Sequence, residues 1–251
     1  MANIKFRLAR RGDVEKLIEI SNHPTNLAEG SAPWYLLAGR HKSPDTVSAA
    51  WEEAIVDFIY STSGWYTCVV AEVEDTDEIA GYCAWEWFDH DEKGKKVVEK
   101  HRPARLQTIW TELGAEEPTR MPPRTYSTID LQDGLLRARW EASGLSDKHE
   151  EAYEALLTTA GSTSFSQFWQ LHHLAVDPRP EHQGLMERLV AWGLEIAEKR
   201  GVWVVVACHE EKKPFYEKLG FRYPGDYTVS VPGDDRELNL AWLQKDPKTN
   251  A

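Results

Sequence analysis

A glycine stands where a predicted strand gives way to a predicted helix, and this position suits the binding of an anion. The strand covers Trp169–Val176, which is rich in apolar and β-favouring residues, and Pro178 and Pro180 forbid a helix through the following turn. Gly184 then opens the helix, whose first turn has unpaired N–H groups and the positive end of the helix dipole. Glycine lets a phosphate approach these groups, although the same residue could serve only to ease a tight turn.

The elements that position this glycine form a strand–helix–strand unit. The helix begins near Gln183, and its apolar residues recur at helical spacing at Leu185, Leu189, Gly193 and Ile196. Gly201 follows its last turn, where Lys199 and Arg200 complement the helix dipole. Val202–Ala207 is a continuous apolar run, which favours a second strand covered on both faces. We therefore predict that the two strands are parallel and joined by a right-handed crossover.

The composition limits the classes of protein to which the chain can belong. It has 251 residues, of which 41% are hydrophobic, and a formal net charge of −12, which argues against a nucleic-acid partner and mildly favours cationic ones. We expect no membrane segment and no signal peptide, because no apolar run is long enough. The cysteines lie in apolar strand-like runs without metal or disulfide spacing, so we expect buried thiols, no metal and a cytoplasmic location.

Further elements are predicted on both sides of this unit. Strands are expected at Ile4–Leu8, Trp65–Val73, Ile79–Phe88, Tyr227–Val231 and Glu237–Leu243. Asp13 is a candidate cap for a helix after the first strand, and a second helix is expected from Ser43 to Tyr60. Asn22–Ser43 is rich in proline and glycine, so we interpret it as a loop.

Two motifs in residues 171–221 resemble those of the GNAT family of acyl-CoA-dependent N-acetyltransferases. Leu-His-His-Leu-Ala-Val-Asp-Pro (171–178) leads into Glu-His-Gln-Gly-Leu-Met (181–186), which is similar to the pyrophosphate loop of the family. Glu181 and Met186 depart from the Gln/Arg and Gly/Ala of that loop. Tyr-Glu-Lys-Leu-Gly-Phe (216–221) resembles the helix-to-strand segment that follows the fifth strand of the family.

The resemblance implies a fold and a domain organisation. The fold would be α/β, with a GNAT-like mixed, twisted sheet of six to seven strands flanked by helices. Residues 1–251 would form a single domain. A helical insertion at 89–168, between the third and fourth strands, would act as a cap near the acceptor site, as in a fungal-type member of the family with a long insertion.

The implied function is that of an N-acetyltransferase. It would transfer acetyl from acetyl-CoA, its co-substrate, to a small-molecule or peptide amine by direct attack, without a metal. A homodimer is one possible assembly of the protein. One alternative is a non-catalytic or degenerate GNAT-fold ligand-binding protein, since Met186 and Glu187 alter the loop. Another is acylation of a hydroxyl group, which would give an ester product.

The resemblance also assigns residues to the cofactor. Pyrophosphate would bind at the start of the helix, and the pantetheine amides would pair with the backbone of a strand that splays from its neighbour after Leu174–Val176. The predicted cofactor-binding residues are Leu174, Ala175, Val176, His182, Gln183, Gly184, Leu185, Met186, Glu187 and Tyr216.

Three residues are candidates for proton transfer. In the resemblance, Tyr216 would protonate the departing thiolate, although it could also be only a half-buried helix tyrosine. His172 falls where arylalkylamine acetyltransferases carry a histidine before Leu-Ala-Val, and an imidazole suits the deprotonation of an amine. The alternative for His172 is a packed strand histidine, and simple alternation puts His173 on the opposite face. Glu86 is a second candidate for the base.

Four residues are candidates for contact with the acceptor. Trp85 and Trp87 share one face of a strand, and aromatic rings can hold a cationic amine by stacking and cation–π attraction. Ordinary core packing is the alternative for both. Trp34 could line the acceptor site or anchor its loop, and His173 lies beside the candidate base.

Overall fold

The computed structural model describes only part of the chain. It describes residues 3–29, 55, 59, 66–89, 167–179, 182–230 and 237–247. Trp34, most of the helix predicted at 43–60 and nearly all of the insertion predicted at 89–168 lie outside the described residues.

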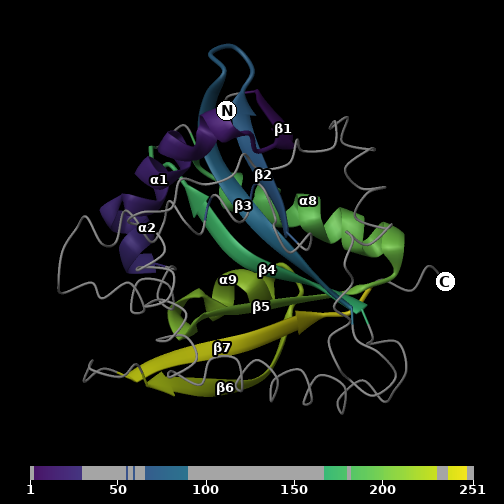
Figure 1. Ribbon diagram of the computed structural model, residues 1–251. Helices are drawn as coiled ribbons and strands as arrows, with labels where there is room; N and C mark the ends of the chain where they lie inside the picture. The colour runs from purple at the N-terminus through teal and green to yellow at the C-terminus, as the bar shows by residue number, and fades with distance from the viewer. Residues whose placement is uncertain are drawn as a thin grey trace, which may run out of the picture.

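Within these residues, seven strands form one sheet in the order β1-β2-β3-β4-β5-β7-β6 (Figure 1). The strands are β1 (Ile4–Leu8), β2 (Tyr66–Val73), β3 (Glu78–Asp89), β4 (Gln167–Val176), β5 (Trp203–His209), β6 (Arg222–Ser230) and β7 (Glu237–Lys245). Neighbouring strands are antiparallel except β4 and β5, which are parallel. The predicted mixed α/β sheet, flanked by helices, is therefore confirmed.

The described helices flank this sheet. They are α1 (Val14–Asn22), α2 (Pro24–Glu29), α8 (Leu185–Arg200) and α9 (Lys213–Lys218), with 3-10 turns η1 (Arg11–Asp13) and η4 (Glu210–Lys212). The prediction of a loop from Asn22 to Ser43 was wrong for α2, because Pro24 occupies the first helical position, where a missing N–H costs nothing. None of the described helices is both long and apolar enough to cross a membrane.

The predicted strand–helix–strand unit is β4–α8–β5. Gly201 ends α8 with a φ of 63°, and its N–H bonds to the carbonyls of Ala197 and Glu198. This left-handed geometry is the one that glycine adopts without strain. β5 is buried through Val204–Val206, as its continuous apolar run requires.

Hydrophobic clusters cover both faces of the sheet. The first lies on the side of α8 and includes Trp85, Trp87, Trp169, Leu189 and Tyr216. The second lies on the side of α1 and includes Leu17, Ile20, Val70, Tyr82 and Ala175. Membership of one cluster or the other therefore tells on which face of the sheet a strand residue lies.

Candidate functional site

The two parallel strands β4 and β5 are paired along only part of their length. Their pairing ends at Leu171 opposite Val206. β4 nevertheless continues to Val176 and β5 to His209, and the two strands diverge toward the end of the sheet where α9 lies (Figure 1). We call this unpaired region the β4–β5 splay.

At the splay, the backbone of β4 has hydrogen-bonding groups that β5 leaves unpaired. Asp177 donates its N–H to the carbonyl of Ala80 on β3 at 2.8 Å. Because successive residues of a strand direct their backbone groups to alternate sides, those of Leu174 and Val176 face the splay. Those of Ala175 face β3 instead. The splay can thus pair with a ligand that carries amide groups, in the manner of an added strand.

The N-terminus of α8 follows shortly after the open end of β4. Gly184 is its N-cap, with a φ of 80°, and no atom lies within 4 Å of the place where its Cβ would be. The space beside this N-cap is therefore open, and the first N–H groups of α8, which suit an anion, belong to the turn that begins there. Met186 is half-buried and packs against the core, whereas Glu187 is exposed in the first turn.

A buried histidine shapes the loop before α8. His182 Nδ1 lies 3.3 Å from the carbonyl oxygen of Asp177 and 3.7 Å from its carboxylate. Burial raises the pKa of Asp177, but hydrogen bonds from Arg179 and the proximity of His182 outweigh it, so the pKa lies below its ordinary value. His182 therefore supports the loop through its imidazole and through its backbone N–H, which donates to the carbonyl of Arg179 at 3.0 Å.

Tyr216 lies in α9, on the α8 side of the sheet. Its ring packs edge-on against Phe215 and Phe221, with centroids 4.9 and 5.5 Å away. Burial raises the pKa of its phenol, and neighbouring Cys208 and Cys83 raise it further. The hydroxyl group therefore stays protonated at neutral pH and can act as a donor.

A β-bulge in β4 decides the orientation of the two histidines. His173 pairs with Ala84 and Leu171 with Trp85, so His172 is the extra residue of the bulge. The prediction that the histidines lie on opposite faces was wrong, because the bulge interrupts the alternation. Both rings contact residues of the α1 face: His172 contacts Tyr66 and His173 contacts Tyr82.

His172 and Glu86 form a buried pair on this face. The Nε2 atom of His172 lies 3.6 Å from Oε2 of Glu86, and the side chains are 10% and 8% exposed. Tyr66 is the cross-strand partner of Glu86, and its ring stands edge-on to His172 at 5.5 Å. An imidazole and a carboxylate so arranged can accept a proton from a bound group.

Comparison with known proteins agrees with this geometry. Residues 115–221, which include β4, α8, β5 and α9, match the model of the acetyltransferase (GNAT) family. A mosquito arylalkylamine N-acetyltransferase-like protein 5b has a similar structure, with a TM-score of 0.54 and 16% identity over 97% of this chain and 100% of that one. The fold is a GNAT fold.

A second solved structure, arylalkylamine N-acetyltransferase 2 from Aedes aegypti, has the same GNAT fold. Its TM-score is 0.51, with 14% identity over 98% of this chain and 100% of that one. At such identities the likeness concerns the fold alone. No curated protein matches the chain significantly.

The GNAT sheet places the predicted acceptor residues in different environments. Trp85 and Trp87 are fully buried in the cluster on the α8 side, away from Glu86, so we do not propose them as acceptor contacts. His173 is 4% exposed, and its ring lies tilted against that of Tyr82, with the centroids 5.1 Å apart. Burial, with a contribution from His172, lowers its pKa to about 3, so it is a neutral neighbour of the pair. Trp34 lies outside the described residues.

Two residues of the site were not predicted from the sequence. Tyr66 would have been found from the register of the β2–β3 hairpin, which puts it opposite Glu86. Asn26 of α2 donates a hydrogen bond to the carbonyl oxygen of Val176 at 2.9 Å. No local pattern signals this contact, because it joins residues far apart in the chain.

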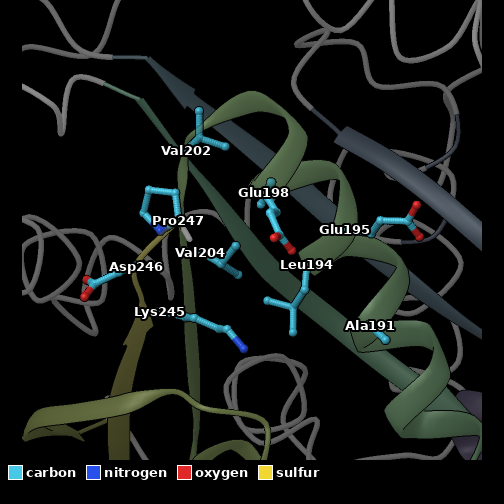
Figure 2. Close-up of a pocket in the computed structure, with 10 residues that line it drawn as sticks. Ala191, Leu194, Glu195, Glu198, Val202, Val204, Lys245, Asp246 and Pro247 are labelled. Atoms are coloured by element: carbon cyan, nitrogen blue, oxygen red, sulfur yellow. The ribbon is translucent and has the colours of Figure 1, made fainter. Parts of the chain in front are cut away.

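A pocket of about 230 Å³ lies elsewhere on the GNAT fold. It is lined by the C-terminal half of α8 and by residues of β5 and the end of β7, among them Val204 and Lys245 (Figure 2). Glu198, near the C-terminus of α8, also lines it, so it lies toward the opposite end of the helix from Gly184. None of the predicted catalytic or cofactor residues contributes to it.

The cysteines are buried and not in disulfides, as predicted: Cys68, Cys83 and Cys208. Across the described ranges, no group of three or more His, Cys, Asp or Glu is arranged to hold a metal ion.

Proposed function

We propose that this protein transfers an acetyl group from acetyl-CoA to a primary amine. The observation that carries the proposal is the β4–β5 splay, where β4 presents the backbone groups of Leu174 and Val176 beyond the end of parallel pairing. The family match over 115–221 includes this region. An amine acceptor also agrees with the two fold neighbours, both named for arylalkylamine N-acetyltransferases.

Acetyl-CoA would bind along the splay and the start of α8. Its pyrophosphate would accept hydrogen bonds from the backbone N–H groups near Gly184, where the helix dipole also favours negative charge. Its pantetheine amides would pair with Leu174 and Val176. Leu185 is buried, so its backbone N–H, and not its side chain, would serve the cofactor, whereas His182 holds the loop through its imidazole and its own N–H.

The acceptor would approach from the α1 face. The Glu86–His172 pair would take a proton from the ammonium form of the amine, directly or through water. The neutral amine nitrogen would then attack the thioester carbonyl carbon, forming the C–N bond as the C–S bond breaks. The electron pair of the C–S bond leaves with the sulfur.

Tyr216 would give its phenolic proton to the departing thiolate, and the second proton of the acylated nitrogen would restore the phenol, so that the products are the neutral amide and the CoA thiol with one proton held by the Glu86–His172 pair. It belongs to the cluster on the α8 side, whereas Glu86 and His172 lie on the α1 side. The splay lies between these two faces. This separation suits direct transfer, because the amine and the cofactor can enter from opposite sides of the sheet.

Acetyl-CoA binding, measured by calorimetry on the wild type and on Gly184→Asp, tests the proposal. We expect micromolar binding by the wild type. Aspartate would add a negative charge at the anion site and strain a backbone with a φ of 80°, so binding should be lost. Gly201→Asp is the matched control, because Gly201 has a φ of 63°, open surroundings and a position at the other end of α8.

The outcomes separate the candidate functions. Loss of binding in Gly184→Asp but not in Gly201→Asp supports the cofactor site, and amide formation with a panel of amines would then establish the transferase. Absence of acetyl-CoA binding in the wild type would contradict the proposal and favour the non-catalytic ligand-binding alternative. An ester product in place of an amide would point to a hydroxyl acceptor.

A further inference from the structure

The side chain of Asn26 joins three elements around the splay. From α2, its Nδ2 atom donates to the carbonyl oxygen of Ile20 in α1 at 2.7 Å and to that of Val176 in β4 at 2.9 Å. The donor group is thus shared between a helix of the α1 face and the strand that borders the splay. Asn26 fixes α2 to both.

The Val176 carbonyl is one of the groups that the proposed cofactor needs. Val176 stands in a non-hydrogen-bonded pair with Gly81, since the neighbouring Asp177 donates to Ala80. Its C=O therefore points away from β3 and toward the splay. In this structure, that carbonyl already accepts the hydrogen bond from Asn26.

Because α2 packs beside α1, it lies on the face that carries the Glu86–His172 pair (Figure 1). One hydrogen bond therefore connects the strand that would bind acetyl-CoA with a helix on the acceptor side. A donor that arrives at Val176 must displace the Asn26 amide or share the oxygen with it. Either change weakens the attachment of α2 to β4.

We propose that Asn26 is a positioning residue that couples cofactor binding in the splay to the placement of α2 at the acceptor side. This inference rests on the proposed function. A pantetheine N–H competes with Asn26 for the Val176 carbonyl, so binding of acetyl-CoA releases α2 from β4. By reciprocity, a contact that holds α2 against β4 opposes cofactor binding by the same factor.

Asn26→Leu tests the coupling, since leucine has a similar size, favours a helix and has no donor. We expect the variant to bind acetyl-CoA about three- to ten-fold more tightly, the range for loss of one competing neutral hydrogen bond. At saturating acetyl-CoA, the KM for the amine and kcat should both stay within about two-fold of the wild-type values, because in the wild type the cofactor has already displaced the Asn26 amide from Val176. A residue needed only for folding would weaken the binding of both substrates.

Adenosine 3′,5′-diphosphate is the discriminating probe, because it carries phosphates for the start of α8 but no pantetheine amides. Its affinity should be the same in the wild type and in Asn26→Leu. Asn3→Leu is the matched control: Asn3 is exposed at the far end of β1 and donates to Glu74, so its loss should leave every constant unchanged.

Each result decides between the two proposals. Wild-type binding of acetyl-CoA with an unchanged affinity in Asn26→Leu overturns the coupling and leaves the proposed function standing. Equal tightening of acetyl-CoA and adenosine 3′,5′-diphosphate overturns it too, since the effect would not arise at the splay. No acetyl-CoA binding by the wild type overturns both proposals.

Discussion

The Nε2 atom of His172 lies 3.6 Å from the Oε2 atom of Glu86, although the two residues belong to β4 and β3 and are 86 positions apart. Both side chains are largely shielded from water. A carboxylate in such a place strengthens the attraction of the imidazole for a proton, because the surrounding medium screens charge poorly. The pair is therefore the strongest candidate for the group that accepts the proton of the amine.

Glu86→Gln should reduce kcat/KM for the amine about 10²- to 10⁴-fold, the usual contribution of a general base. The reduction in kcat/KM for His172→Asn should fall in the same range. If the two residues act as one unit, the double variant loses no more than the worse single variant. Steady-state kinetics checks this, with Glu195→Gln, an exposed partner of Lys199 on α8, as the control. If the fold losses in kcat/KM of the two single variants multiply in the double variant, the two residues act independently.

Tyr216→Phe should lower kcat about 10²-fold and change acetyl-CoA affinity little, because it removes a donor from the leaving thiolate and keeps the buried ring. Burial raises the pKa of this phenol, so the wild-type hydroxyl stays protonated well above neutral pH. Thiol release during turnover measures the effect. Tyr223→Phe, in β6, is the control, and a wild-type kcat in Tyr216→Phe would assign Tyr216 to packing alone.

Because of His173, the free energy of unfolding should fall as the pH is lowered. Its folded pKa is about 3 and its ordinary value is 6.5, because burial disfavours the imidazolium ion. Between these values the unfolded chain binds the extra proton. The contribution of neutral His173 to the free energy of unfolding is thus fully present above pH 6.5. It is lost as the pH falls toward 3, by at most about 1.4 kcal/mol per pH unit.

Urea unfolding from pH 7 to pH 4 measures this dependence. The free energy of unfolding of His173→Asn should fall less steeply with pH than that of the wild type. His23→Asn, at an exposed position after α1, should keep the wild-type slope. Equal slopes for His173→Asn and the wild type would mean that the imidazole is protonated in the folded state.

Gly193→Ala should destabilise the protein by about 1–3 kcal/mol, the usual cost of overpacking a core. A Cβ at this position of α8 would overlap the indole ring of Trp85, which is fully buried. The free energy of unfolding in denaturant is the measurement. Gly12→Ala, where a Cβ meets nothing within 4 Å, should change it little.

The double variant Gly193→Ala/Trp85→Phe gives the sharper test of this contact. Phenylalanine lacks the outer ring atoms that the new methyl group would meet. The loss in the double variant should therefore be smaller than the sum of the two single losses. Strict additivity would place the cost of Gly193→Ala elsewhere in the helix.

Local sequence was sufficient for the strand–helix–strand unit. The apolar run of β5 predicts a strand buried on both faces, and the prolines after Val176 exclude a helix until Gly184. Gly201 and Gly220 have the left-handed backbone expected of residues that end helices. These features depend on neighbours along the chain, so they can be predicted without knowledge of the fold.

The tertiary structure alone decided how the candidate site is assembled. The faces of His172 and His173 follow from a bulge, which arises only when β4 pairs with β3 in one particular register. The end of pairing at Leu171 and the contact of Asn26 with Val176 likewise depend on distant segments. The residue types of the site are thus set by the sequence, whereas their proximity is set by strand register and helix packing, which no local pattern encodes.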